Sequence, residues 1–436
     1  MTTPTARRPR PSGPPSRAGR ACPRIAVALA TAALVAGCAG ADPGTAGAGA
    51  TGTPSAAATD WATVQAQARG KQVDLWMYGG DQQGNAYVDT VLAPAARAEG
   101  VTIRRVPVTD TADVLNRVLS EQRAGRTGDG SVDLVWVNGE NFRTGKQAGA
   151  WRCGWSSTLP NTKYTDPADP LLTSDFGTPV DGCEAPWHKA QFVFAYDSAK
   201  VPDPPTTVAG LLDWAKAHPG RFTYPAPPDF TGSAFVRQAL YSVAGGPASL
   251  PTAYSKSSYD AATPALWKRL SDLAPSLWRQ GSTYPRDLPQ LEKLYADGQV
   301  DITMTYGPAT LDALVRKGTF PATTRVLDLA DGTLGNASFL GIPANAADPS
   351  AAMVVANLAL SPEQQLAKAK PDVWGQYTVL AQDRLPADVR AGFAALPSSP
   401  VVPPFAELSR DAAPELAAAW VTPLDRDWRA RVLGAG

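Results

Sequence analysis

Strand and helix patterns alternate between Val73 and Val137, and this order limits the possible fold more than any other feature of the sequence. The apolar segments 73–78, 101–108 and 132–137 have the length of strands, and the segments between them, 85–97 and 113–123, have helical spacing. The last strand is apolar almost throughout, which is typical of a strand covered on both faces. The order predicts an α/β fold with a parallel sheet between helices.

A second series of elements follows this one. We expect further strands at 191–196, 222–224 and 301–306, and further helices at 208–217, 232–243, 261–280, 288–297, 350–360 and 363–370. The stretch after Pro403 is expected to be mostly helical. The segment 61–436 is longer than a chain that usually folds around a single hydrophobic core, so we expect two domains.

The first 37 residues have the composition of a secretory signal. Six arginines and no acidic residue precede an apolar stretch from Ile25 to Gly37, and small residues lead up to Cys38. This stretch is too short to cross a bilayer as a permanent helix. Residues 38–60 are rich in Ala, Gly, Thr, Pro and Ser, so we expect a flexible tether there.

The end of this signal, Leu34 to Cys38, resembles the lipobox of bacterial lipoproteins. In that class the cysteine is lipidated and becomes the first mature residue, so the resemblance makes Cys38 the expected lipid anchor. We therefore expect a protein anchored on the extracytoplasmic face of the cell membrane. An ordinary secretory signal with a chance cysteine is the alternative.

Charge and cysteine content narrow the function further. Forty basic and forty acidic residues give no net charge, and no long basic block is present, so we expect no nucleic-acid partner. Cys22 leaves with the signal, and in an oxidising compartment the remaining pair, Cys153 and Cys183, predicts a disulfide, with two free thiols as the alternative. The sequence lacks HExxH, CxxC and GxSxG motifs, so we expect neither a metal nor a cofactor.

Three segments carry recognisable motifs: 340–366, with Ile-Pro, a small-residue helix and Ser-Pro-Glu; 184–200, which contains Tyr-Asp; and 301–308, DITMTYGP. Together they resemble the family 1 extracellular solute-binding proteins of bacterial ABC importers. The resemblance implies a type II periplasmic-binding-protein-like fold with two discontinuous lobes, a hinge and a cleft. It implies a monomer without catalytic activity that passes its solute to a membrane permease. The stretches 138–142 and 229–233 resemble a subgroup for which thiamine has been proposed as the solute.

The resemblance also implies how the chain divides. Lobe 1 is expected to contain residues 61–190 and about 335–375, and lobe 2 residues 191–334 and about 376–436. The alternative is an extracytoplasmic, glycosidase-like hydrolase, because Asp81, Glu140, Asp229 and Asp301 would supply candidate carboxylate pairs.

The expected ligand contacts lie mostly after strands, because ligands of open α/β sheets bind beyond the carboxyl ends of the strands. They offer rings, amides, hydroxyls and carboxylates, which suit a small polar solute: Tyr78, Asp81, Asn138, Glu140, Asn141, Tyr224, Asp229, Thr231, Ser233 and Tyr306, with Trp187 before the crossing strand. The carboxylates favour a cation. The helix start at Thr231-Gly232-Ser233 instead suits an anionic group. For each residue the alternative is a structural role as a core ring, a helix cap or a solvated carboxylate.

Overall fold

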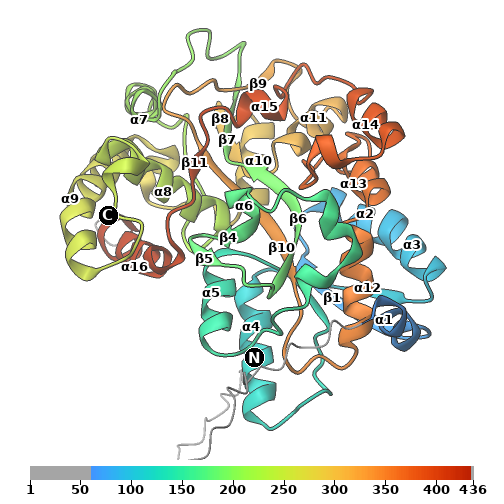
Figure 1. The fold of residues 1–436 in the computed structure, drawn as a ribbon. Coiled ribbons are helices and arrows are strands. Elements are labelled where there is room, and N and C mark those ends of the chain that lie inside the picture. Colours follow the sequence, from blue (N-terminus) through green and yellow to red (C-terminus); the bar gives the residue numbers. More distant parts are fainter. Residues whose placement is uncertain (1–59, 434–436) are drawn as a thin grey trace, which may run out of the picture. The chain divides into compact units, whose positions relative to one another are not determined.

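Two sheets organise the computed structural model, which describes residues 60–433 (Figure 1). The larger sheet has the strand order β11-β10-β3-β1-β2, with β6 also paired to β10, and the smaller has the order β8-β7-β9. Two short strands, β4 and β5, form a separate pair. The strands are β1 Gln72–Tyr78, β2 Thr102–Val108, β3 Leu134–Val137, β4 Ser174–Asp175, β5 Thr178–Pro179, β6 Glu184–Gln191, β7 Val193–Asp197, β8 Ile302–Thr305, β9 Thr324–Val326, β10 Leu334–Gly341 and β11 Ala413–Pro414.

Sixteen α-helices lie between residues 60 and 433. They are α1 Trp61–Ala68, α2 Gln82–Tyr87, α3 Ala93–Ala98, α4 Thr111–Arg123, α5 Gly139–Gln147, α6 Pro170–Thr173, α7 Val208–Ala217, α8 Phe230–Ala244, α9 Lys256–Leu273, α10 Leu288–Ala296, α11 Pro308–Arg316, α12 Pro349–Ala359, α13 Pro362–Ala369, α14 Ala387–Ala394, α15 Phe405–Leu408 and α16 Val421–Trp428. None of these helices is both long and apolar enough to span a bilayer.

The large sheet is mixed rather than fully parallel. β1 pairs in parallel with β2 and β3, as the sequence predicts, but β10 is antiparallel to both β3 and β6. The sequence analysis did not predict β10. All eight of its residues are buried, so it lacks the alternation of a half-exposed strand, and its Gly, Asn and Ser residues weaken the apolar pattern.

Most of the predicted helices are present, and one of the predicted strands is absent. The expected helix 85–97 is divided into α2, a π-helical turn at Val88–Leu92, and α3, and α7 has the predicted bounds. The expected strand 222–224 is wrong: the segment is buried but pairs with no strand among the described residues. Pro225 and Pro227 follow it, and prolines lack the N–H donors that a ladder needs.

Helices cover both faces of the large sheet. Leu75 and Met77 of β1 pack into a cluster with residues of α1, α3 and α12, whereas Val135 and Val137 of β3 pack with α4 and Phe142 of α5. The small sheet has its own core, in which β7 and β8 meet α7, α8, α9, α10 and the C-terminal helix α16. The described chain therefore contains two α/β cores with a sheet in each.

The segment after α13 does not pack where the sequence analysis placed it. Val379, Leu380 and Val389 join a cluster with Phe339 of β10 and Leu360, so residues 379–389 lie with the large sheet and not with lobe 2. Val401, Val402 and the apolar residues of α16 pack into the core of the small sheet, although β11 pairs with β10 of the large sheet. The carboxyl-terminal part of the chain therefore contributes to both cores.

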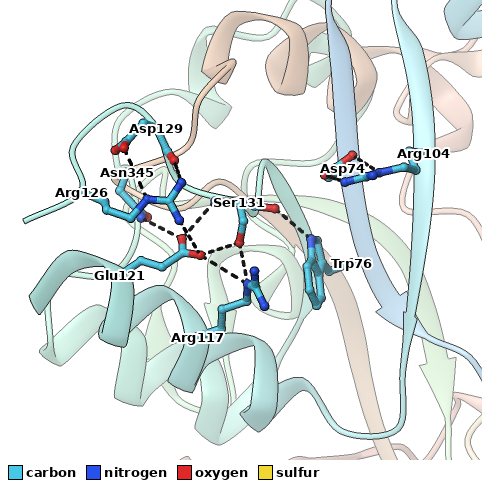
Figure 2. A network of polar contacts seen from close by, with 9 residues as sticks. All are labelled: Asp74, Trp76, Arg104, Arg117, Glu121, Arg126, Asp129, Ser131 and Asn345. Atoms are coloured by element: carbon cyan, nitrogen blue, oxygen red, sulfur yellow. Dashed lines mark hydrogen bonds and ion pairs between the residues drawn. The ribbon is translucent and has the colours of Figure 1, made fainter. Parts of the chain in front are cut away.

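An ion-pair network joins α4 to the segment just before β3 (Figure 2). Glu121 of α4 pairs with Arg117 at 3.3 Å and Arg126 at 3.1 Å, and it accepts the backbone N–H of Ser131 at 3.0 Å. The Ser131 carbonyl in turn accepts the indole N–H of Trp76 at 3.3 Å. The network lies next to the amino-terminal end of β3. The ligand contacts expected from the sequence lie beyond the carboxyl ends of the strands, so they are not part of it.

Candidate ligand-binding site

Asp81 lies just beyond the carboxyl end of β1 and caps α2. Its Oδ1 accepts the backbone N–H of Gly84 at 2.9 Å, and its Oδ2 accepts the indole N–H of Trp374 at 2.7 Å. A Cβ on Gly84 would meet the Trp374 ring at 2.8 Å, so a larger residue would displace the indole. Burial raises the pKa of Asp81, and these donors oppose the rise.

Asp229 caps α8 in a similar way. Its Oδ1 accepts the backbone N–H groups of Thr231 and Gly232, each at 3.0 Å, which satisfies two free donors of the helix N-terminus. The expected anion site is therefore occupied by a carboxylate of the chain itself. A Cβ on Gly232 would lie 2.0 Å from the carbonyl oxygen of Pro225, so this glycine permits a contact within the protein. Burial raises the pKa of Asp229 to about 6.

Helix α10 contributes two carboxylates that the sequence analysis did not single out. Asp287 caps the helix by accepting the backbone N–H of Gln290 at 3.0 Å, and it pairs with the exposed side chain of Arg286 at 2.8 Å. Glu292 lies on the same helix. Burial raises the pKa of Glu292 to about 7, and the charge of Asp81 adds to the rise.

These carboxylates lie close enough to Tyr78, the last residue of β1, for their charges to act on its hydroxyl. Burial raises the pKa of Tyr78, and the charges that add to the rise are those of Asp229, Asp287, Glu292 and Asp81. All four are acidic side chains, and they come from three separate places in the chain: the turn after β1, the start of α8 and the start and middle of α10. We call Tyr78, Asp81, Asp229, Asp287 and Glu292 the acidic cluster.

An exposed aromatic ring directly follows Asp229, a member of this cluster, in the sequence. This residue is Phe230, and its side chain is 42% exposed. Between residues 60 and 433, only one other large apolar side chain is as exposed. Its ring centroid lies 5.2 Å from that of Tyr306 and 6.3 Å from that of Phe176. Phe230 thus offers an open ring face or edge near carboxylates, a combination that suits a cation.

Four rings pack together behind Asp81. They belong to Trp136 of β3, Trp187 and His188 of β6, and Trp374, and their centroids lie between 5.0 and 5.9 Å apart. Trp187 has no exposed surface, so it supports the site from behind and does not line it. Burial also holds the pKa of His188 well below its usual value, so the ring is neutral.

Tyr224, another expected contact, is a core residue. Its side chain has no exposed surface, and its ring stacks on Phe235 with 4.1 Å between centroids. Its hydroxyl accepts the indole N–H of Trp428 at 2.9 Å. The hydroxyl therefore has a partner within the protein. The expectation that Tyr224 contacts the ligand is corrected: its ring fills the core.

Ser233 and Tyr306 belong to a buried network around Arg237 of α8. Arg237 donates to the two carboxylate oxygens of Glu415 at 2.8 and 3.0 Å, and to the Ser233 hydroxyl at 2.9 Å. The Tyr306 hydroxyl also donates to Glu415, and the Ser233 hydroxyl donates to Asp425 at 2.7 Å. We call these five residues the arginine network. Its polar atoms satisfy one another in this conformation, so a solute would have to compete with them.

Of the residues after β3, Glu140 lies near this network. Asn138, Glu140 and Asn141 are all half-buried at the start of α5. Glu140 accepts a hydrogen bond from the Thr422 hydroxyl. Burial raises the pKa of Glu140, and the charge of Asp425 adds to the rise. The expected contacts therefore divide into two groups, and only Tyr78, Asp81 and Asp229 join the acidic cluster.

The cysteines fall in two regions. Cys153 and Cys183 form a disulfide that closes a loop of 30 residues, the pairing that the sequence predicts. Cys38 lies outside the described residues, as do the predicted signal and most of the tether.

Comparison with known proteins points to one family. Residues 90–392 match the model of the bacterial extracellular solute-binding proteins. Protein YnjB of Escherichia coli K12 is 39% identical over 371 residues, which cover 85% of this chain and 93% of YnjB. None of these matches supports the hydrolase alternative.

Solved structures share the fold at low sequence identity. A periplasmic thiamin binding protein has a TM-score of 0.54 at 16% identity, covering 83% of this chain and 96% of its own. The spermidine/putrescine substrate-binding protein PotD of Streptococcus pneumoniae has a TM-score of 0.57 at 13% identity, covering 83% of this chain and 99% of its own. The chain thus has the type II periplasmic-binding-protein fold that the sequence analysis expected.

Proposed function

The chain belongs to the bacterial extracellular solute-binding proteins, the substrate-binding components of ABC importers, and from this premise we propose that it captures a small organic cation at the acidic cluster. The single observation that carries the proposal is that four carboxylates from three places in the chain lie near enough to Tyr78 for their charges to raise its pKa.

The charge of the cluster favours a positive solute. Burial and mutual repulsion raise the pKa of Asp229 to about 6 and that of Glu292 to about 7. A bound cation would offset the repulsion and favour the ionised forms of both groups. A neutral or anionic solute would leave the repulsion in place or increase it.

The arrangement favours an organic cation over a metal ion. Within residues 60–433, no group of three or more His, Cys, Asp or Glu side chains is placed to hold a metal. Carboxylates spread around a site suit a molecule that carries several donors or a delocalised charge. The rings of Tyr78 and Phe230 add faces to which such a cation is attracted. The fold neighbours described as binding thiamin and spermidine/putrescine both take organic cations, which agrees with this class.

A cation at this site would also favour closure. Tyr78 and Asp81 extend from the large sheet, whereas α8 and α10, which carry Asp229, Asp287 and Glu292, pack in the core of the small sheet. A solute that contacts both groups binds the closed form better than the open form and shifts the hinge equilibrium by that difference.

Titration calorimetry with thiamine, spermidine and choline, and with glucose as a neutral comparison, tests the proposal. We expect saturable binding of at least one cation, and at least tenfold weaker binding of it by Asp81→Asn and Glu292→Gln. Asp213→Asn, an exposed aspartate on α7, is the matched control and should bind like the wild type. The proposal fails if glucose binds and no cation does, or if both cluster variants keep full affinity.

We further propose that the protein is a monomer anchored through Cys38, after removal of residues 1–37 as a lipoprotein signal and with residues 38–60 as tether. The lobes would then be residues 61–190 with about 335–396, and residues 191–334 with about 397–436. A Cys38→Ala variant should leave the membrane fraction and appear in the medium or soluble extract. Retention of that variant in the membrane fraction would contradict the anchor.

A further inference from the structure

Gln376, in the segment between α13 and α14, is a buried polar residue outside the acidic cluster. It is 4% exposed. Its side-chain amide makes no hydrogen bond with any residue of the described chain, and neither amide atom is fully enclosed by protein. The amide of this buried side chain therefore opens onto accessible space. Since buried amides normally have hydrogen-bond partners, this one is available to a partner from outside the chain.

The segment that carries Gln376 lies at the carboxyl ends of strands from both sheets. Two residues earlier, Trp374 donates to Asp81, just beyond the end of β1 of the large sheet. A Cβ on Gly307 would lie 3.5 Å from Gln376 Nε2, and Gly307 lies between β8 of the small sheet and α11. Ligands of open α/β sheets bind beyond the carboxyl ends of strands, so Gln376 lies where a solute is expected.

The end of β8 also leads to the acidic cluster. Tyr306 precedes Gly307, and its ring centroid lies 5.2 Å from that of Phe230, the residue after Asp229. Short contacts thus connect Gln376 with the acidic cluster by two routes, one through each sheet.

A neutral amide gives the site a property that its carboxylates lack. An ionised carboxylate only accepts hydrogen bonds, whereas the amide of Gln376 accepts through Oε1 and donates two hydrogens through Nε2. A hydroxyl or amino group on the solute can pair with this amide. A fully alkylated ammonium compound cannot, and it would displace water from the amide without replacing the hydrogen bonds.

We propose that Gln376 is a specificity-determining contact of the acidic cluster, which selects organic cations that carry a hydroxyl or amino group besides the positive charge. The inference rests on the proposed function, because it concerns the same solute and the same site. The carboxylates bind the charge, and the amide distinguishes one cation from another.

Calorimetry with Gln376→Met tests this role, since methionine keeps the length of the side chain and removes the amide. Thiamine, spermidine and choline all carry a hydroxyl or an amino group. We expect each of them that binds the wild type to bind Gln376→Met about fivefold more weakly or worse, the contribution of one hydrogen bond. Gln147→Met, at an exposed position at the end of α5, is the matched control and should bind like the wild type.

A pair of probes separates recognition by the amide from a general loss of structure. Propyltrimethylammonium has a methyl group where choline has its hydroxyl, and it keeps the charge. Gln376→Met should shift the ratio of the two affinities at least about fivefold towards propyltrimethylammonium, whereas a merely loosened site would weaken both alike.

The outcomes distinguish this inference from the proposed function. If none of thiamine, spermidine and choline binds the wild type, the proposed function fails and the inference with it. If one of them binds and a folded Gln376→Met variant keeps its affinity, only the role of Gln376 is overturned.

A crystal structure of the wild-type protein with the tightest-binding of these three cations is independent of how the variant folds. The expected result is an oxygen or nitrogen atom of the cation within hydrogen-bond distance of the Gln376 amide. An amide that contacts only water or protein in that complex would overturn the inference.

Discussion

The indole N–H of Trp374 donates to the carboxylate of Asp81 at 2.7 Å, across 293 positions of the sequence. Through this hydrogen bond, Trp374, which follows α13, holds the side chain of Asp81 in the acidic cluster in place. The same indole packs against Trp136, Trp187 and His188, so the position of Asp81 depends on the aromatic core behind it.

We predict that Trp374→Phe lowers both stability and cation affinity. It keeps most of the ring packing but leaves the buried Asp81 oxygen without its donor, which typically costs about 1–3 kcal/mol. Urea denaturation measures the stability and calorimetry the affinity. Trp214→Phe is the control, because Trp214 is half-buried on α7 and stacks on His218 away from the site, and it should change neither quantity by as much.

We predict that the protein without a bound solute loses stability as the pH rises from about 4.5 to 7, the range in which Glu292 of the acidic cluster ionises. Glu292 has a pKa of about 7 in the folded chain against 4.5 in the reference state, so the folded state binds the proton more tightly. By linkage, stability falls from about pH 4.5 to pH 7, and about 3 kcal/mol is an upper estimate of the loss. Thermal denaturation across this range measures it.

The matching variant is Glu292→Gln, which cannot ionise. It should be more stable than the wild type at pH 8 without solute, show a smaller pH dependence between pH 4.5 and 7, and bind cations more weakly. Glu99→Gln, an exposed position next to α3, should behave like the wild type. A Glu292→Gln protein with an unchanged pH profile would show that Glu292 is not buried against Asp81.

We predict that Glu415→Gln destabilises the fold by about 3–5 kcal/mol. The Arg237 and Glu415 side chains are only 1% and 3% exposed, and loss of one partner leaves a buried charge without compensation. Denaturant unfolding checks the value. Asp260→Asn is the comparison, because Asp260 pairs with Lys256 at the surface, where side chains are 54% and 74% exposed, and such pairs contribute about 1 kcal/mol or less.

We predict that the pair of substitutions Cys153→Ser and Cys183→Ser costs about 3–4 kcal/mol, because the bond closes a 30-residue loop in the unfolded chain. The melting temperature, with and without reductant, measures this. The wild-type protein should lose stability in reductant and gain two mass units, whereas the serine variant should show neither change.

Local chemistry explains which site residues the sequence could identify. Asp81 and Asp229 cap helices directly after short connections, and a cap is set by residues within one turn of it. Glu292 could not be distinguished from a solvated acid on a helix, because its raised pKa depends on burial in the folded chain and on the charge of Asp81, which lies more than two hundred positions away. Tyr224 and Trp187 follow or precede extended segments as expected, but only packing decides whether a ring lines a cleft or fills a core.

The sequence by itself determined the α/β class, the parallel pairing of β1 with β2 and β3, the bounds of most predicted helices and the cysteine pair, because each depends on short-range periodicity, capping or composition; the family followed from the resemblance of three segments. Only the tertiary structure decided that β10 enters the sheet antiparallel, that residues 379–389 pack with the large sheet, and that four carboxylates lie near enough to Tyr78 to raise its pKa. Those features arise from contacts between distant segments, whose energies depend on burial and charge that no local pattern of residues encodes.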